Sequence, residues 1–481
     1  MGSLYPQTSF VKVFSSPNED IPVSIKEISD SYFISFRTLL EPFSLLQGTT
    51  LRKLDNQGDK EIELEYLPTT NSAFNLDKII PINNSEFIAI ARNKKEDDES
   101  AYLNVIRYDT ALFEIWNKEY KMHTPLIGNI AAVLTGNDRI VIGCTEETPM
   151  PNWQMELMFM EITTDGDSIK AMYGYGGNPD FTQIYSLLLI NGNYKAFVNG
   201  FSSYVPYTGF SEILSLDTNL NLLGVKSVPF IIQEYMTAEK IDESRYYVTG
   251  KAYSSSTHFD VGIAKLSLTE DSLAYNHTGK PGKAVDYSGW KQCMSTANSN
   301  SIYTGGTGND NGLFYSCYIT NKVLMLSNYD SLLNCRWTRF YGSDTACYTL
   351  STLEATSDGG CIMGGMFVTP SRPENLLDAV IIKVDSLGLF TGLHENTGVQ
   401  IHEANIYPNP GSQIITVQCG PQIIGATFSL HDATGRLVSE ALLKSTQFQV
   451  DVNQLSSGTY YWKIHQKGKL ADSGKWIKQQ D

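Results

Sequence analysis

Short apolar runs recur along residues 1–398 at a nearly constant spacing. In each copy a first apolar run ends in a small residue and is followed by a polar loop. A second apolar run then ends in a Leu-Asp-like turn, and an aromatic run follows it. The clearest copy spans residues 356–388. The second runs end at residues 55, 109, 163, 217, 267, 327 and 385. The runs are rich in β-branched and aromatic residues and show no helical periodicity. A period of about 50 residues is typical of β-propeller blades, so seven copies predict seven blades.

The last copy lacks an outer aromatic strand after Gly388. A propeller has to close its ring because open sheet edges invite pairing with other chains. The run Phe10–Phe14 stands where the outer strand of a preceding blade should be. We therefore expect residues 9–14 to complete the last blade as a closing strand.

Residues 399–481 depart from this period. Alternating runs at 414–417, 427–430, 448–452 and 459–464 predict several short strands, and Asp432–Arg436 has the glycine of a hairpin loop. Several short strands in about 80 residues favour a small Ig-like β-sandwich. The fold class is therefore all-β, with a propeller over 1–398 and a sandwich over 399–481.

Four segments of this tail occur in a characteristic order: Tyr407–Pro410, Asp432–Val438, Leu455–Tyr461, and a basic ending that contains Gly468, Lys469, Gly474, Lys475 and Lys478. Together they resemble the type A C-terminal sorting domain of the type IX secretion system. The alternative is a carbohydrate-binding or Ig-like accessory domain.

This resemblance implies a Gram-negative bacterium of the Bacteroidota type. It also implies export through the periplasm and the outer membrane, with the cargo released or attached to the cell surface. The partners would be the type IX translocon and its outer-membrane shuttle proteins. The basic ending would carry the sorting signal. The first residues, Met1–Pro6, lack the basic and apolar regions of a signal peptide, and we expect that a natural signal peptide has been removed from this sequence.

The propeller repeats resemble uncharacterised secreted propellers, which combine Asp-Gly-Gly motifs such as Asp358–Gly360 with Lys-Leu-Asp strands such as Lys53–Asp55. That resemblance implies no chemistry.

Charge separates the two parts. The chain of 481 residues has a net charge of -16, yet residues 399–481 hold seven Lys/Arg and six Asp/Glu. The remaining excess of 17 acidic residues therefore belongs to the propeller. Phosphate binding needs clustered cations, so we expect no nucleic-acid partner. No apolar stretch approaches the length of a membrane span.

Asp-Ser or Asp-Thr pairs followed by an aliphatic residue resemble the general O-glycosylation motif of this bacterial group. The candidate acceptors are Thr110, Ser168, Ser272, Ser331, Thr345 and Ser386. Most of them fall at the same turn of the repeat, where Asp and Ser also close turns by side-chain hydrogen bonds. Both interpretations stay open on the sequence alone.

No catalytic motif stands out. The chain contains no nucleophile elbow, zinc-protease motif, phosphate loop or EF-hand loop. The seven cysteines show no CxxC spacing, so we predict neither a metal site nor a cofactor. An oxidising compartment would permit one or two disulfides and leave at least one thiol free, but we favour the interpretation that most of the cysteines are small buried residues.

The loop after the second strand of each blade should emerge on one face of the propeller. These loops carry the candidate ligand-binding residues Trp153, Tyr204, Tyr207, Tyr253, His258 and Arg372. Aromatic residues on a ring of loops suit a glycan or protein ligand, and packing between blades is the competing explanation. We therefore expect a secreted or cell-surface binding module. The alternatives are a polysaccharide-active hydrolase or lyase with carboxylates near the central channel, and an adhesin that associates with itself.

Overall fold

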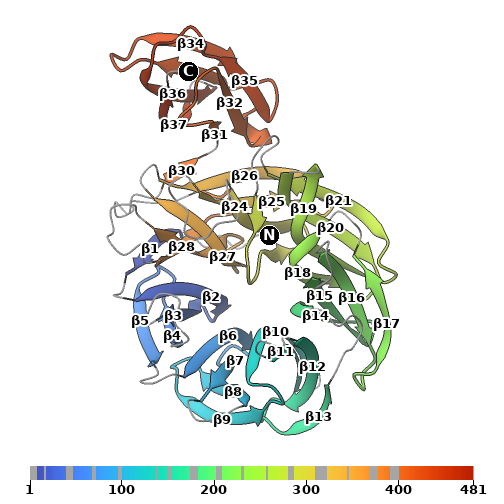
Figure 1. The fold of residues 1–481 in the computed structure, drawn as a ribbon. Coiled ribbons are helices and arrows are strands. Elements are labelled where there is room, and N and C mark those ends of the chain that lie inside the picture. Colours follow the sequence, from blue (N-terminus) through green and yellow to red (C-terminus); the bar gives the residue numbers. More distant parts are fainter. Residues whose placement is uncertain are drawn as a thin grey trace.

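The computed structural model consists of a ring of small β-sheets and a separate β-sandwich (Figure 1). The structure describes residues 8–15, 18–39, 47–67, 72–95, 100–136, 138–148, 154–173, 182–201, 209–228, 232–255, 258–279, 286–308, 322–343, 346–368, 377–389, 400–402, 404–467 and 469–479. Within these ranges the sheets of the ring form seven blades. The predicted propeller followed by a small sandwich is confirmed.

The first four blades each contain four antiparallel strands, which follow one another from the axis outwards. Blade 1 consists of β2 (Glu19–Ile28), β3 (Ser31–Leu39), β4 (Gln47–Leu54) and β5 (Lys60–Tyr66). Blade 2 consists of β6 (Ala73–Pro81), β7 (Glu86–Lys94), β8 (Ala101–Asp109) and β9 (Glu114–Lys121). Blade 3 consists of β10 (Leu126–Thr135), β11 (Arg139–Thr148), β12 (Gln154–Thr163) and β13 (Ser168–Tyr173). Blade 4 consists of β14 (Thr182–Ile190), β15 (Asn193–Phe201), β16 (Gly209–Leu216) and β17 (Leu222–Ser227).

Blade 5 follows the same plan, and the last two blades vary it. Blade 5 consists of β18 (Gln233–Asp242), β19 (Arg245–Ser255), β20 (His258–Ser267) and β21 (Ser272–Thr278). Blade 6 has a divided inner strand, β22 (Tyr287–Ser288) and β23 (Met294–Asn298), followed by β24 (Ser301–Gly308), β25 (Val323–Tyr329), β26 (Cys335–Gly342) and β30 (Gln400–His402). Blade 7 consists of β27 (Cys347–Ala355), β28 (Cys361–Val368), β29 (Asp378–Val384) and β1 (Phe10–Phe14).

Blade 7 combines the two ends of the propeller sequence. Strand β1 pairs antiparallel with β29, from Phe10 opposite Lys383 to Phe14 opposite Ala379. Phe10 is buried and packs in one cluster with Tyr32 of blade 1 and Ile381 of blade 7. The amino-terminal strand therefore covers the outer edge of the last blade and contributes to its contact with the first.

The turn between the two outer strands has the same construction in most blades. In blade 1, Asp55 Oδ1 accepts the backbone N–H groups of Gln57 and Asp59, both at 2.8 Å. The equivalent carboxylates are Asp109, Asp217, Asp330 and Asp385. The third residue after each of them has a positive φ, as in a three-residue hairpin loop with a bulge. In the sixth repeat this turn is at Asp330 rather than at the expected residue 327, because β25 continues to Tyr329.

Apolar side chains fill each contact between neighbouring blades. One buried cluster joins each adjacent pair, including blades 7 and 1, among the described residues. Between blades 6 and 7, for example, Trp337 and Tyr341 pack with Leu350 and Met363. Tyr341 Oη also donates a hydrogen bond to the carbonyl of Gly388, at 3.0 Å, in the turn of blade 7. The repeats therefore depend on their neighbours for burial of their apolar faces.

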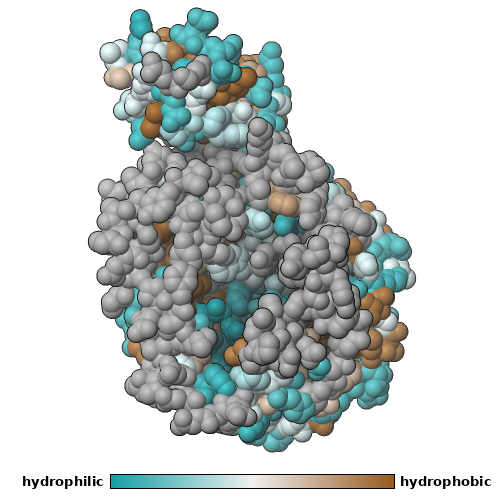
Figure 2. Space-filling model, viewed as in Figure 1, coloured by the Kyte–Doolittle hydropathy of each residue, from teal (hydrophilic) through white to brown (hydrophobic). Residues whose placement is uncertain are grey.

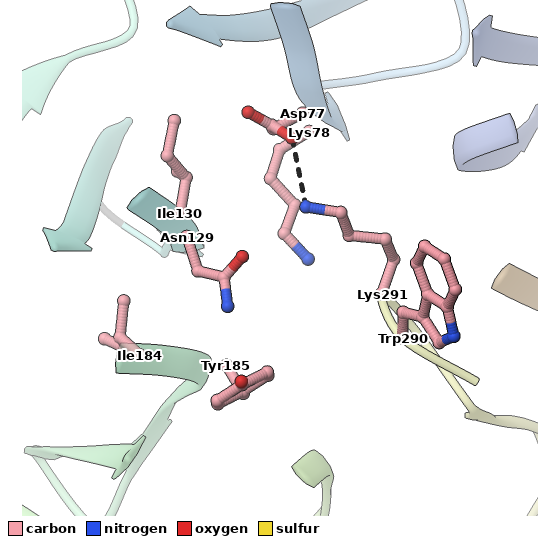
Figure 3. Close-up of a pocket in the computed structure, with 8 residues that line it drawn as sticks. All are labelled: Asp77, Lys78, Asn129, Ile130, Ile184, Tyr185, Trp290 and Lys291. Carbon is pink, nitrogen blue, oxygen red and sulfur yellow. Dashed lines mark hydrogen bonds and ion pairs between the residues drawn. The ribbon is translucent and has the colours of Figure 1, made fainter. Parts of the chain in front are cut away.

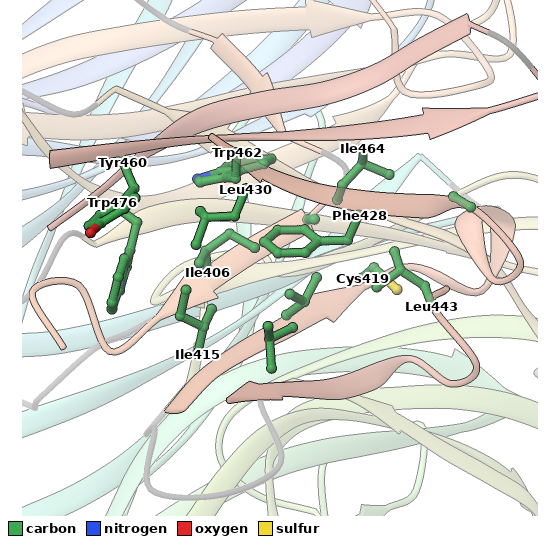
Figure 4. Close-up of a cluster of buried hydrophobic side chains, with 14 of the residues drawn as sticks. Ile406, Ile415, Cys419, Phe428, Leu430, Leu443, Tyr460, Trp462, Ile464 and Trp476 are labelled. Carbon is green, nitrogen blue, oxygen red and sulfur yellow. The ribbon is translucent and has the colours of Figure 1, made fainter. Parts of the chain in front are cut away.

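The tail forms two facing sheets over its own core (Figure 4). One sheet contains β31 (Ala404–Tyr407), β32 (Ile414–Cys419) and β35 (Gln447–Asp451). The other contains β34 (Leu437–Leu442), β33 (Thr427–His431), β36 (Gly458–Gln466) and β37 (Lys469–Lys478). A short 3-10 helix, η1 (Pro421–Ile423), lies between β32 and β33.

The tail contacts the propeller along blade 6. Strand β30 lies in the range expected for the tail, and it pairs antiparallel with β26, from Gln400 opposite Gly342 to His402 opposite Phe340. Beyond that strand, Gln422 Nε2 in η1 donates a hydrogen bond to the Thr338 carbonyl at 3.1 Å. The sandwich is thereby placed against the outer edge of one blade (Figure 1).

Six cysteines fall within the described residues, and none of them forms a disulfide there; Cys317 lies outside these residues. Burial raises the pKa of the Cys293 thiol to about 11, as expected for an unreactive packed side chain. Among the described helices none has the length and apolarity that crossing a membrane requires.

Candidate functional site

The inner strands of the propeller share an irregularity near their middle. Register shifts interrupt the pairing at Pro22–Ser24, Leu76–Lys78, Ile127–Ile130, Ile184–Ser186, Gln233–Thr237 and Leu350–Thr352. In blade 6 the corresponding stretch is the interval between β22 and β23. A bulge inserts an unpaired residue and redirects side chains, which is why bulges often occur beside functional sites. The bulges of blades 2 to 4 contain Asp77, Asn129 and Tyr185.

These three residues line a hollow at the axis of the propeller. The pocket opens to solvent and has about 10 Å³ of room for the centre of a water-sized sphere, and its walls are Asp77, Lys78, Asn129, Ile130, Ile184, Tyr185, Trp290 and Lys291 (Figure 3). Hydrophilic residues are visible at the bottom of the central hollow in the space-filling view (Figure 2). Four blades therefore contribute side chains to one polar site.

Asp77 lies at the centre of a cationic cluster. Its carboxylate is 2 % exposed and accepts hydrogen bonds from Arg92 Nε, from Arg92 Nη2 at 3.2 Å and from Lys291 Nζ at 3.2 Å. Arg37 Nη2 lies 3.6 Å from Asp77 Oδ1. Burial alone would raise the pKa of Asp77, but the attraction of Arg92, Lys291 and Arg37 outweighs it and holds that pKa well below its ordinary value. Three cations therefore surround a single ionised carboxylate.

The cations in the cluster are themselves perturbed. Burial lowers the pKa of Lys291 to about 7, although Asp77 opposes this shift. Burial, with repulsion from Arg92, lowers the pKa of Arg37 to about 10. Each shift shows that burial disfavours the charged form of these groups, so that Lys291 is only partly protonated near pH 7.

A second charged group lies beside Lys78. Lys26 forms a 2.7 Å ion pair with Glu354, whose Oε2 also accepts a hydrogen bond from Gln292 Nε2 at 2.9 Å. Burial lowers the pKa of Lys78 to about 8, and repulsion from Lys26 adds to the shift. Burial also raises the pKa of Glu239 to about 7, against a hydrogen bond from Thr296 that favours the ionised form. The axis thus contains both excess cations and one carboxyl group that titrates near neutrality.

None of the predicted loop residues lines the axial pocket among the described residues. Trp153, Tyr204, Tyr207 and Arg372 lie outside the described residues. Tyr253 lies in β19 and His258 in β20, where Tyr253 is paired opposite Phe259. Their role in binding stays a prediction. The axial residues were not foreseen from the sequence, although charged residues within inner apolar runs, such as Asp77 beside Ile79, were an available signal.

The candidate glycosylation residues divide into two positions of the outer turn. Thr110, Ser331 and Ser386 directly follow the turn carboxylates, whereas Ser168 and Ser272 begin the outermost strands and are exposed. Thr345 lies outside the described residues. The hydrogen bonds of the turn account for the Asp residues without any modification, so glycosylation stays a prediction.

In the tail, two of the sequence motifs meet in space. Asn409 Nδ2 donates to the Lys475 carbonyl at 2.9 Å, and the Ile477 N–H donates to Asn409 Oδ1 at 2.9 Å. The indole of Trp476, which is fully buried, donates to the Pro408 carbonyl at 2.7 Å. The Tyr407–Pro410 segment is therefore fastened to the last strand, β37.

The predicted sorting residues differ in their surroundings. Lys478 is buried and its ammonium group donates to the Ser412 carbonyl, whereas Lys475 is half-buried. Gly474 lies opposite Trp462, and a Cβ added to it would be 2.5 Å from the indole ring. Lys469 begins β37 opposite Gln466, and Gly468 lies outside the described residues.

Residues 405–479 match the family described as the secretion system C-terminal sorting domain. The tail is a type IX sorting domain. This sorting domain marks the chain as cargo of the type IX secretion system, delivered to the cell surface or beyond it. A comparison with curated protein sequences finds no match.

Several solved structures are similar to the chain at low sequence identity. A protein of unknown function from Dyadobacter fermentans DSM 18053 is 10% identical, covers 64% of this chain and 93% of its own, and has a TM-score of 0.40. The GH93 α-L-arabinofuranosidase of Fusarium graminearum is 10% identical over 63% of this chain and 92% of its own, with a TM-score of 0.41. A subtype N10 neuraminidase-like protein of A/little yellow-shouldered bat/Guatemala/060/2010 is 10% identical over 62% and 91%, with a TM-score of 0.36. These likenesses say nothing about a ligand or a reaction of this chain.

Proposed function

We propose that the exported propeller is a glycan-binding module whose ligand enters the axial pocket. The observation that carries this proposal is the convergence of aromatic and hydrogen-bonding side chains from different blades on one open hollow. Tyr185 and Trp290 offer flat apolar surfaces with polar edges, and the Asn129 amide lies across the pocket from Lys291 and Trp290 (Figure 3). A concave site of this kind, with a few convergent polar groups, suits a small polar ligand.

Binding rather than catalysis is favoured by the state of Asp77. A general acid or base needs a pKa near the working pH, and the three cations hold Asp77 firmly in its ionised form. Its hydrogen bonds to Arg92 and Lys291 also occupy the lone pairs that would receive a proton. Asp77 therefore acts as a fixed anchor for the cations.

A hydrolase is the second candidate function, and one observation favours it. Glu239, with a pKa raised to about 7 by burial, has the proton affinity of a general acid, and it lies within the electrostatic influence of Glu354. Glycoside hydrolysis uses a protonated carboxyl group together with a second carboxyl group about 5 to 10 Å away. Release of reducing ends from a panel of polysaccharides, abolished by Glu239→Gln, would establish this function in place of the first.

The test of the binding function is a glycan array probed with the full chain. We expect Tyr185→Ala and Trp290→Ala to lose the signal, because each removes a wall of the pocket. Phe113→Ala removes an aromatic side chain that is 72 % exposed on the outside of blade 2 and serves as the matched control. Equal binding by all three variants would place the ligand elsewhere. Trp153→Ala and Tyr207→Ala then test the predicted loop surface.

For export, we propose that the type IX translocon and its shuttle proteins recognise the face that carries Lys475. Lys475 is accessible, whereas Lys478 supports the fold through Ser412. We expect Lys475→Ala to reduce export without changing thermal stability, and Lys478→Met to reduce both. Normal export of Lys475→Ala would refute this assignment.

A further inference from the structure

We propose that the axial pocket binds an acidic group of the ligand, a carboxylate or sulfate carried by a saccharide, through Lys78 and Lys291. The proposal rests on the proposed glycan-binding function and names the chemical class of its ligand.

The first argument is the balance of charge. Arg37, Arg92 and Lys291 surround Asp77, so cations outnumber the carboxylate in this cluster, and Glu147, which interacts with Arg92, offsets only part of the excess. The chain as a whole has a net charge of -16, so a buried positive excess runs against its composition. Uncompensated buried charge is costly and is commonly retained where a ligand supplies the missing partner.

The second argument is the supply of free donors. Arg37 contacts Asp77 only at 3.6 Å, and its buried Nε has no hydrogen-bond partner among the described residues. Lys78 lines the pocket, and its ammonium group is directed into the same space as the Asn129 amide (Figure 3). Within the described part of the chain no acceptor is bonded to Lys78 Nζ. An oxyanion in this space would lie against Lys78 of blade 2 and Lys291 of blade 6.

Two aromatic side chains line the pocket together with the cations. Tyr185 and Trp290 line the same pocket, so a ligand with both a charged group and a ring fits better than a bare ion. An acidic saccharide has both. A neutral saccharide would leave the charge uncompensated.

The proposal has a consequence for pH. Lys291 faces Asp77, Arg37 and Arg92, which keep their charges near neutrality, and its pKa is about 7. It therefore gains a proton as the pH falls from 8 to 6, and an anion binds more tightly to the protonated form.

The second lysine responds in the same direction. Lys78 faces Asp77, Lys26 and Glu354, and its pKa is about 8. Glu239, which interacts with Glu354 and Lys26, also takes up its proton near pH 7 and so adds to the positive balance. All three groups make acidic ligands bind better at the lower pH.

The test is calorimetric titration of the full chain with trigalacturonate and with its methyl ester, which has the same rings without the charge. A sulfated galactose oligosaccharide and its desulfated form provide the second pair. We expect one of the acidic probes to bind about tenfold more tightly than its neutral partner at pH 6, and the difference to shrink at pH 8. The pair that shows the difference tells carboxylate from sulfate.

Variants locate the site. Lys291→Gln and Lys78→Gln should each weaken the acidic probe by about tenfold and leave the neutral probe unchanged. Lys444→Gln removes an exposed lysine of the tail and is the matched control. Thermal unfolding of each variant shows whether it is folded, and if Lys291→Gln is not, Lys78→Gln carries the test.

The outcomes separate the two proposals. Equal affinity for acidic and neutral probes, or binding that is indifferent to both lysine variants, overturns the acidic-ligand proposal and leaves glycan binding in place. Binding of neutral glycans on the array with no binding of either acidic probe does the same. No binding of any glycan overturns the proposed function and the acidic-saccharide proposal with it.

Discussion

Replacing Asn409 by alanine tests whether the Tyr407–Pro410 segment of the sorting domain is held by the last strand. The side chain makes two hydrogen bonds of 2.9 Å, one to the carbonyl of Lys475 and one from the amide of Ile477. Alanine leaves both backbone groups without their partner. Each such bond contributes about 0.5 to 1.5 kcal/mol net, so the loss should amount to about 1 to 3 kcal/mol.

Hydrogen exchange of the full chain measures this loss where it occurs. The Gly411 amide donates to the Ile477 carbonyl at 3.0 Å, and the Gln479 amide donates to the Gly411 carbonyl at 2.8 Å. Both amides lie beside Asn409 and depend on the same contact between the segment and β37. A loss of about 1 to 3 kcal/mol speeds their exchange by roughly 5- to 150-fold if they open locally.

Two further variants sharpen the test. Asn409→Asp keeps an acceptor for the Ile477 amide but places a negative charge beside the Lys475 carbonyl. We expect this variant to speed exchange of the Gly411 and Gln479 amides by no more than Asn409→Ala does, and not to slow it. Asn453→Ala removes an exposed asparagine from the same domain and should change nothing near Gly411. If Asn409→Ala and Asn453→Ala exchange alike at Gly411 and Gln479, the segment is held by other contacts and our explanation fails.

Other substitutions probe the propeller and the turns. Glu239→Gln keeps the acceptor for Thr296 and removes a carboxyl group whose pKa is raised to about 7. The buried carboxylate destabilises the fold above pH 7, and this destabilisation is absent below about pH 4.5, where the group is protonated. We therefore expect the unfolding free energy of the variant to exceed that of the parent by about 1 to 2 kcal/mol at pH 8 and by almost nothing at pH 4.5. A gain at pH 4.5 as large as at pH 8 would contradict the raised pKa. Gly388→Ala places a Cβ at φ 73° and 2.8 Å from the Trp337 ring, and should cost about 2 to 4 kcal/mol in thermal unfolding. Gly435→Ala, at φ 84° with open space around it, should cost only about 1 to 2 kcal/mol, and equal costs would show that packing against Trp337 is unimportant.

The fold could be predicted from the sequence because each blade repeats the same pattern of apolar and turn residues. Apolar alternation sets the strands, and an Asp such as Asp55 or Asp109 followed three residues later by a left-handed residue sets the outer turn. The left-handed position is glycine at Gly58 but leucine at Leu112, where burial of the side chain offsets the backbone cost. The sixth repeat is predicted to turn three residues too early because its apolar run ends at Leu326, whereas β25 continues to Tyr329.

The candidate site was harder to foresee because it belongs to no single repeat. Asp77, Tyr185 and Lys291 come from three blades and meet only when the ring is complete. Their inward direction depends on bulges, and a bulge of one residue leaves no clear mark on an alternating pattern. The aromatic loop residues could be identified from the sequence pattern, whereas the axial cations could not, because they occur within apolar runs.

Because β1 pairs with β29, blade 7 forms only when both ends of the propeller sequence are present. A chain that stops before Asp378, or that is cut after Phe14 and loses β1, cannot finish blade 7, and Phe10 is no longer buried against blade 1. Both faults expose a sheet edge, where proteases and other unpaired strands can reach it. Only an intact chain completes the outer strand of blade 7, which is a useful property for cargo that must survive outside the cell.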